Sequence, residues 1–351
     1  MAPRNPSARL VDIARQAGVS LPVASKVLNN RPGVADDTRA RVEQALYANG
    51  YRRRRRTAAD SSHTVELLLD DLHTPWSEEI LSGVIEGLSS DYLPTISART
   101  SDEWDLNAWL EGMIARCPAG VLVPLFDLPS HAMERLRQSG IPCVLIDPAG
   151  DVPEGAPAIG SNDYAGMREA TQHLLAMGHR RIAYLGGPAY LRTAVARLDG
   201  FRSAMRQAKI PIDDALVTAG EFRFDDGEAN ARRLLGLSEP PTAILAASDM
   251  QAAGVYRAAW ELGVRIPSEL SVVGFDDLPT SALLIPPLTT VHHAVREMAQ
   301  FGAASLMSMI EGTSSLPTHV ELTTKLVRRD SVAEPRSVTA ETSTDPGVIP
   351  S

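Results

Sequence analysis

The sequence has few of the features that mark secreted, membrane-spanning or redox proteins. Its 351 residues include two cysteines, Cys117 and Cys143, which lie far apart and outside any C-x-x-C pattern. They predict two reduced thiols and no metal or redox role. No apolar run reaches the roughly 18 residues that a membrane-spanning helix needs, and the first residues lack the apolar segment of an export signal. We therefore expect a cytoplasmic protein that does not contact a membrane.

Catalytic motifs are also lacking. The sequence contains no nucleophile elbow, H-E-x-x-H motif or P-loop. L-G-G-P at residues 185–188 is too short for a dinucleotide fingerprint. Carboxylates beside a sugar site would leave a glycosidase as an alternative, which turnover of a bound sugar would reveal. We predict a protein that is not an enzyme and needs no cofactor.

Charge is distributed unevenly along the chain. Up to Arg56 there are twelve Lys or Arg and four acidic residues, so this segment carries +8, whereas the whole chain carries −9. The remainder therefore carries −17. A basic end attracts a polyanion and an acidic remainder repels it, which indicates a DNA-binding head on an acidic body.

The basic end has the pattern of a helix-turn-helix. Leu10, Ile13, Ala14 and Ala17 have the spacing of one apolar helix face, and Gly18 can adopt the positive φ of a tight turn. Ser20 can cap a second helix that buries residues 23, 24, 27 and 28. A third helix is expected over residues 36–49, with residues 38, 42, 45 and 46 closing the core.

One face of the second helix is left free to meet a major groove. It carries Leu21, Ser25 and Asn29, with Pro22 and Lys26 beside them. The alternative is a small helical bundle that binds protein. The turn pattern, the charge and the terminal position together favour DNA.

From residue 64 onward, β-rich runs alternate with helical stretches, the pattern of parallel βαβ units. The length fits two sheets better than one. Strands are expected at residues 65–70, 93–98, 120–125, 142–146, 181–186, 216–218, 242–246 and 270–275. Helices are expected at residues 76–89, 106–116, 130–139, 164–177, 197–208, 227–235, 250–262 and 295–311.

The predicted fold class is α/β: an all-α helix-turn-helix head and a two-lobed body with two parallel sheets. Residues 160–163 are expected to form the first crossing between lobes, and residues 285–290 the return. The expected divisions are the head at 1–52, an Arg-rich linker at 53–63, an effector-binding and dimerisation domain at 64–333 and a disordered tail at 334–351. Lobe 1 would comprise about 64–161 and 291–322, and lobe 2 about 162–290 and 323–333.

Polar and aromatic residues follow the predicted strands, where ligands of open parallel sheets bind. The first strand is followed by Thr74 and Trp76, and later strands by Arg197, Ser248 and Asp276. Arg and carboxylates with an aromatic face suit a polyhydroxylated ligand. Other interpretations of these residues remain open. Trp76 would instead belong to the core, and Arg197 would form an ion pair between the lobes. Asp276 and Asp277 would cap a short helix. His292 and His293 are expected to be a solvated pair.

The head resembles that of the lactose-repressor (LacI/GalR) family. The motifs are D-I-A-x-x-A-G-V-S-x-x-x-x-S-K-V-L-N, T-R-x-R-V and N-G-Y-R, over residues 10–52. The resemblance implies that Leu21, Pro22 and Lys26 read bases, while Ser20, Ser25 and Asn29 hold phosphates.

The sequence departs from the family at two places in and after the head. Ala35 replaces the usual Ser or Thr cap of the third helix. The family's hinge helix ends in a leucine, and no leucine lies between Tyr51 and His63. The arginine run there, including Arg53, Arg54 and Arg55, either grips phosphates or a narrow minor groove or is a disordered polycation.

The body resembles the same family's ligand domain, which is similar to periplasmic sugar-binding proteins. The motifs are S-N-D-Y-A-G, L-L-A-M-G-H-R-R-I-A-Y-L-G-G-P, R-L-D-G-F, A-S-D-M-Q-A-A-G-V-Y, S-V-V-G-F-D-D and P-P-L-T-T-V. The resemblance implies Arg197 and Asp276 as the main effector contacts and Phe222 as an aromatic stacker facing Trp76. It places Asn162 at the interlobe crossing, as a further predicted effector contact. Ser248 departs from the family's usual Asn.

Together these features predict a sequence-specific DNA-binding transcription regulator, a homodimer on double-stranded operator DNA, released by a sugar or oligosaccharide. A corepressed regulator that binds a nucleobase or another metabolite, and a transport receptor without a role at DNA, are the alternatives. The tail lacks leucine heptads, so a tetramer joined by a coiled coil is not expected.

Overall fold

The computed structural model describes residues 10–28, 33–48, 63–99, 104–313 and 319–336. The chain divides into two compact units, residues 1–61 and residues 62–351, which we call the head and the body. Asn29, the arginines at 52–56 and the tail beyond residue 336 lie outside the described residues. No described helix is long and apolar enough to cross a membrane.

The head is a three-helix unit. Its helices are α1 (Leu10–Gln16), α2 (Leu21–Leu28) and α3 (Asp36–Ala48). Gly18 has φ +66° and turns the chain between α1 and α2, as the sequence predicts. Ile13, Ala24 and Val42 are completely buried at the centre of the head, and the small Ala24 lets the helices approach closely.

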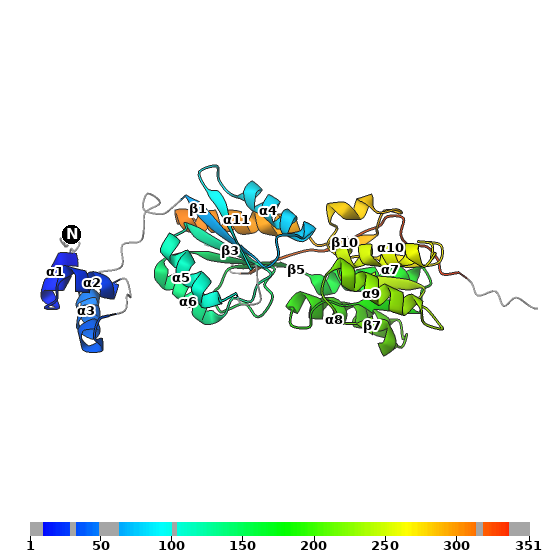
Figure 1. The fold of residues 1–351 in the computed structure, drawn as a ribbon, viewed down its shortest axis with the longest axis horizontal. Coiled ribbons are helices and arrows are strands. Elements are labelled where there is room, and N and C mark those ends of the chain that lie inside the picture. The colour runs from blue at the N-terminus through cyan, green and yellow to red at the C-terminus, as the bar shows by residue number, and fades with distance from the viewer. Residues whose placement is uncertain (1–9, 29–32, 49–62, 100–103, 314–318, 337–351) are drawn as a thin grey trace, which may run out of the picture. The chain divides into compact units, whose positions relative to one another are not determined.

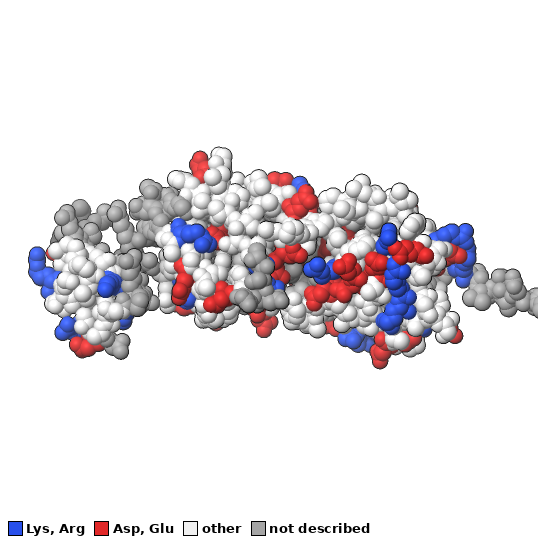
Figure 2. All heavy atoms as spheres, viewed as in Figure 1, with Lys and Arg blue, Asp and Glu red and all other residues white. Residues whose placement is uncertain are grey.

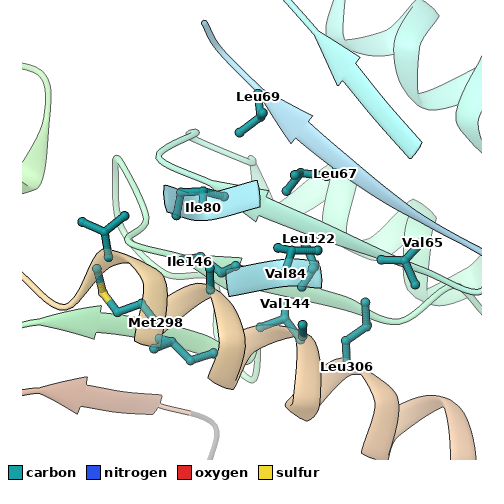
Figure 3. Packing of buried hydrophobic residues seen from close by; sticks show 14 of the residues in the cluster. Val65, Leu67, Leu69, Ile80, Val84, Leu122, Val144, Ile146, Met298 and Leu306 are labelled. Atoms are coloured by element: carbon teal, nitrogen blue, oxygen red, sulfur yellow. The ribbon is translucent and has the colours of Figure 1, made fainter. Parts of the chain in front are cut away.

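The first lobe of the body is a six-stranded parallel sheet in the order β11-β5-β4-β3-β1-β2 (Figure 1). Side chains along β1 alternate between its two faces: Leu67 packs under α4 and α11 (Figure 3), and Leu68 packs under α5 and α6. The strands are β1 (Thr64–Leu69), β2 (Leu93–Ala98), β3 (Gly120–Pro124), β4 (Cys143–Ile146), β5 (Ala158–Ser161) and β11 (His319–Leu322). The helices are α4 (Pro75–Gly87), α5 (Leu106–Arg116), α6 (Ser130–Ser139) and α11 (Val295–Glu311).

The second lobe is a four-stranded parallel sheet in the order β7-β6-β8-β9. Helices α7 and α8 cover one face of this sheet, and α9 and α10 cover the other. The strands are β6 (Ile182–Leu185), β7 (Val217–Thr218), β8 (Ala243–Ala246) and β9 (Ser271–Val273), and the helices are α7 (Asp163–Ala176), α8 (Arg192–Gln207), α9 (Phe224–Leu235) and α10 (Asp249–Glu261).

Glycines allow α9 and α10 to pack closely. A Cβ on Gly227 would lie 2.1 Å from the backbone oxygen of Gln251, and one on Gly254 would lie 2.2 Å from that of Phe224. Larger side chains at these positions would force the two helices apart. The packed pair of α9 and α10 supports the end of β8, where the candidate functional site described below begins.

Short strands missed by the sequence analysis connect the lobes. β5 joins the first sheet where a crossing was expected, and β10 (Thr290–His292) pairs antiparallel with β12 (Lys325–Val327). The chain passes from the first lobe to the second between β5 and α7. It returns between β10 and α11 and passes back between β11 and β12, so it crosses between the lobes three times. The return lies after residue 290 and not within residues 285–290, whose Thr289 bridges to Val273 of β9.

Candidate functional site

In the head, the outer face of α2 is available for contact. Leu21 is 44% exposed, Pro22 and Lys26 are exposed, and Ser25 is partly buried. Ser20, also exposed, lies immediately before α2, and its carbonyl oxygen accepts from the backbone N–H of Ala24 at 3.0 Å. Five predicted DNA contacts therefore lie on or next to one helix. Figure 2 shows acidic side chains mainly over the body.

In the body, one cavity of about 140 Å³ lies where the strand ends of the two sheets face each other. It contains six of the seven predicted effector residues: Thr74, Trp76, Arg197, Phe222, Ser248 and Asp276. Asp70, Asp71, Ser77, Pro124, Leu125, Asp147, Thr193, Met250 and Leu278 complete the lining. The rule that ligands bind at strand ends thus identifies the cavity correctly.

Asn162 is the exception. It does not line the cavity; its side-chain oxygen caps α7 by accepting from Ala165 N at 2.9 Å, and its amide donates to Glu321 at 2.9 Å. Both the oxygen and the nitrogen of the Asn162 amide are already hydrogen-bonded within the fold. The expectation that Asn162 contacts effector is therefore not supported by the geometry.

Arg197 is the electrostatic centre of the cavity. It does not open a helix as expected, because α8 begins five residues earlier at Arg192. The guanidinium is 3% exposed and donates to Asp163 Oδ1 at 2.6 Å and to the Ala247 carbonyl at 2.5 Å. It also lies 3.3 Å from Asp276 Oδ1. Because the crossing residue Asp163 begins α7, these pairs hold the second lobe's own elements together.

Aromatic rings flank this cation, and one of them, Phe222, lines the cavity. The Arg197 Cζ atom lies 3.9 Å from the ring centre of Phe275 and 5.2 Å from that of Phe222. Trp76 lies on the first lobe, where it packs against the core and is also exposed to the cavity. Apolar faces on two walls with charged groups between them suit a ring that carries hydroxyls.

The two neighbouring aspartates differ in their contacts. Asp276 lines the cavity, whereas Asp277 pairs with Arg329 at 2.7 Å and with His292 at 3.2 Å. Neither caps the short helix at Pro279–Leu283, whose N-cap is Leu278. Both have positive φ, 115° and 56°. Such strained backbone in non-glycine residues is concentrated at functional sites.

Ser248 is already engaged within the fold. Its hydroxyl caps α10 by accepting from Gln251 N at 3.1 Å, and it lies 3.4 Å from the Phe222 carbonyl. The next residue, Asp249, accepts from Leu278 N at 2.8 Å and from two hydroxyls at 2.5 Å. This buried carboxylate fixes the loop that carries Asp276.

Four of the residues that the sequence analysis missed, Thr193, Asp147, Asp163 and His293, bear directly on the chemistry of the site. Thr193, one turn before Arg197, lines the cavity with a buried hydroxyl that has no hydrogen-bond partner within the described part of the chain. Asp147 follows β4, so the strand-end rule would have found it. Asp163 and His293 gave no comparable signal.

His293 corrects a prediction. His292 and His293 are not a solvated pair, because His293 is completely buried, while the side chain of His292 is 38% exposed. The His293 ring lies 3.5–3.7 Å from carboxylate oxygens of Asp147, Asp163 and Asp276. His293 is buried because it directly follows β10, where the chain crosses between the lobes through the interior of the body.

His293 forms a buried cluster with Asp147, Asp163 and Asp276. Burial controls the ionisation of several of its groups. It raises the pKa of Asp147 to about 8, and the nearby Asp163 adds to the rise. Burial likewise raises the pKa of Asp276 well above its ordinary value, against the attraction of Arg197. It lowers the pKa of His293 to about 4. Near neutral pH the cluster therefore contains a neutral imidazole and a protonated Asp147, and both can hydrogen-bond a hydroxyl.

Comparison with known proteins agrees with this architecture. Residues 9–54 match the model of bacterial regulatory proteins of the lacI family, and residues 171–332 match the periplasmic binding protein-like domain. The regulator MalR of Streptomyces coelicolor is 35% identical over 337 residues, covering 93% of this chain and 96% of that protein. The chain belongs to the lacI family. It is thus a DNA-binding transcriptional regulator with a ligand domain of the periplasmic-binding-protein type, and members of this family are regulators and not enzymes.

Other relatives of this lacI-family chain extend the comparison. The ribose operon repressor of Escherichia coli is 30% identical and covers 92% of this chain and 99% of its own length. The complex of the regulator CelR with cellobiose is similar with a TM-score of 0.70 and 29% identity, over 92% of this chain and 99% of that one. The lac repressor dimer bound to operator and an anti-inducer has a TM-score of 0.67 and 25% identity, over 93% and 100%.

Proposed function

We propose that this lacI-family regulator is a cytoplasmic repressor that releases operator DNA when a sugar or oligosaccharide binds in the body's cavity. The observation that carries the sugar assignment is the combination, in one cavity, of Arg197 and Asp276 between the aromatic faces of Trp76 and Phe222. The unpartnered hydroxyl of Thr193 adds a polar group that a ligand hydroxyl can satisfy.

Sugar-binding relatives support this proposal. CelR was solved with cellobiose, and another relative represses a ribose operon. Effector binding must be coupled to the arrangement of the two lobes. A ligand shifts the equilibrium between two lobe arrangements only when it binds them unequally. The cavity lining comes from both lobes, so its ligand is placed to distinguish lobe arrangements.

For the head, we propose that Leu21, Pro22 and Lys26 contact base edges, while Ser20 and Ser25 hold phosphates. The exposed outer face of α2 supports this assignment. Asn29 and Arg53, Arg54 and Arg55, which lie outside the described residues, remain predicted DNA contacts on sequence grounds.

We also propose that the protein is a homodimer that reads two half-sites. The first lobe offers a surface for this: β2 is an edge strand, and Leu93 and Ile96 on it are 66% and 44% exposed, with Ile85 of α4 at 55%. Sedimentation should give a dimer that Leu93→Glu weakens. Trp260→Glu, at a residue 73% exposed on the second lobe, is the control and should leave the dimer intact.

The test of function uses the full chain and duplexes selected from a random pool. Binding to the selected duplex should exceed binding to a scrambled one at every salt concentration and should weaken steeply as salt rises. Lys26→Ala should reduce the preference for the selected duplex, whereas Lys209→Ala, far from the head in the chain, should not.

The effector test follows with the same duplex. A panel of monosaccharides and oligosaccharides is screened by calorimetry, and each binder is added to the protein–DNA complex. The proposal requires a sugar that binds and releases the duplex. A ligand that tightens the complex would instead identify a corepressed regulator, and equal binding to all duplexes would exclude a sequence-specific regulator.

A further inference from the structure

His293 is buried in the body. It is 0% exposed, and neither of its ring nitrogens has a hydrogen-bond partner among the residues that the structure describes. Its Nε2 atom lies 3.7 Å from Asp147 Oδ2 and 3.6 Å from Asp163 Oδ1. A buried polar atom without a partner is costly, by roughly 1–3 kcal/mol. The ring is therefore placed for a ligand atom between these groups.

The spacing of the three side chains fits a metal ion. One donor atom each from Asp147, Asp163 and His293 lies within 4.8 Å of the other two. Zinc binds such nitrogen and oxygen donors at about 2.0–2.2 Å, which at a tetrahedral angle separates two donors by about 3.4 Å. The observed 3.6 and 3.7 Å from His293 Nε2 to the two carboxylates are close to this spacing, and the third separation is at most 4.8 Å.

The other side of the imidazole has the arrangement of a metal-binding histidine. Its Nδ1 atom lies 3.5 Å from Asp276 Oδ1. Metal-ligating histidines usually donate their second N–H to a carboxylate, which fixes the ring and the tautomer. Asp276 is therefore placed to orient His293 while Nε2 faces the other two carboxylates.

The cluster can also balance the charge of a dication. Three buried carboxylates, Asp147, Asp163 and Asp276, surround one buried guanidinium, that of Arg197. With all three carboxylates ionised the group carries −2, which a divalent cation brings to neutrality. Binding of the ion would release the proton that Asp147 holds without it. The Asp163 carboxylate, already bonded to Arg197 Nε at 2.6 Å, would lie between the two cations and reduce their repulsion.

We propose that His293 Nε2, Asp147 and Asp163 bind one first-row divalent cation, Zn²⁺ or Mn²⁺, at the base of the cavity. A donor set of one imidazole and two carboxylates suits these ions better than Ca²⁺ or Mg²⁺, which prefer oxygen alone. Asp147 lines the cavity, so the ion can enter there and keep an open position toward it. That an effector hydroxyl fills this position rests on the proposed function.

The test measures metal binding without any sugar. The full chain, free of affinity-tag histidines and stripped with a chelator, is titrated with ZnCl₂ or MnCl₂ against a chromophoric indicator. We expect one equivalent of ion per chain. His293→Gln should weaken the affinity at least 100-fold, and His292→Gln, a neighbouring histidine that pairs with Asp277 outside the cluster, should leave it unchanged.

Two further variants separate ligands from support. Asp147→Asn should lose the ion as His293→Gln does and serves if that variant does not fold, as judged by circular dichroism. Asp276→Asn should weaken binding by about 10–100-fold, the usual effect of removing such an outer carboxylate. Cobalt substitution should give visible absorption bands that are absent in His293→Gln.

The proposal is overturned if no ion binds below millimolar concentration, or if the His293 and His292 variants bind equally well. In either case the sugar proposal stands, because its experiments use DNA release and calorimetry. Conversely, a bound ion without any sugar response would support the metal site and refute the sugar assignment.

Discussion

Removing the charge of Arg197 should destabilise the body strongly. Arg197→Met keeps a long side chain that can lie against Phe275 but leaves Asp163 and Asp276 without their buried cation. Breaking a buried pair from one side costs about 3–5 kcal/mol. For a domain of this size each kcal/mol lowers the Tm by roughly 2–4 °C, so the expected fall is roughly 6–20 °C.

Tryptophan fluorescence is the appropriate assay. All four tryptophans, Trp76, Trp104, Trp109 and Trp260, belong to the body, so the transition reports the body without the head. The matched control is Arg265→Met, because the Arg265 side chain is 67% exposed and pairs with Glu269 on the surface. Such a substitution typically changes stability by less than about 0.5 kcal/mol.

The comparison decides whether the buried network holds the second lobe together. If Arg197→Met lowers the Tm no more than Arg265→Met, the reasoning is refuted. Arg197→Lys should lie between wild type and Arg197→Met, since a lysine restores the charge without the planar fork that reaches Asp163 and the Ala247 carbonyl together. Selected-duplex binding by Arg197→Met below its Tm should persist.

Three other predictions follow from the site and its support. Phe222→Ala should weaken sugar binding roughly tenfold, as expected for about 1–1.5 kcal/mol of aromatic contact; calorimetry showing unchanged affinity would place the ligand elsewhere. Gly227→Ala should destabilise the body by about 1–3 kcal/mol through overpacking against α10, measured by urea unfolding, whereas Gly112→Ala, with only a flexible arginine nitrogen at 3.4 Å, should be neutral or stabilising. Burial lowers the pKa of His179 below its ordinary 6.5, so the folded state resists a proton that the unfolded chain accepts. Its contribution to stability is thus complete above pH 6.5 and is lost as the pH falls below it; a His179→Gln variant whose Tm declines on acidification as steeply as that of wild type would contradict this.

Several elements were predictable because their signals are local. The helices at Leu106–Arg116, Ser130–Ser139 and Val295–Glu311 begin and end where the sequence pattern predicts. The start of α8 was missed, and its N-cap, Leu191, makes no side-chain hydrogen bond that would mark it in the sequence.

The missed strands depend on partners far away in the chain. β10 and β12 have three residues each and form a two-stranded sheet with one another. Strands so short carry too few residues for an alternating pattern to be detected. Sequence periodicity therefore identifies most strands of the two main sheets, but neither β5 and β11 of the first sheet nor the connections between the lobes.

The buried cluster was harder to foresee for the same reason. Asp147, Asp163 and His293 come from three separate segments that meet only in the folded body. A histidine beside another histidine resembles a surface pair in sequence, and its burial follows from the path of the crossing strand. Asp276 and Arg197 were identified because family motifs contain them.

The triple passage of the chain between lobes constrains biosynthesis. The second lobe's sheet is complete once β9 has been translated, whereas the first still awaits α11 and β11 from the last part of the chain. During translation, hydrophobic residues such as Val65, Leu67 and Ile146 must therefore wait for their covering helix. A chain that ends before residue 295 would have the complete main sheet of the second lobe, still without β12, and one open, aggregation-prone sheet in the first lobe.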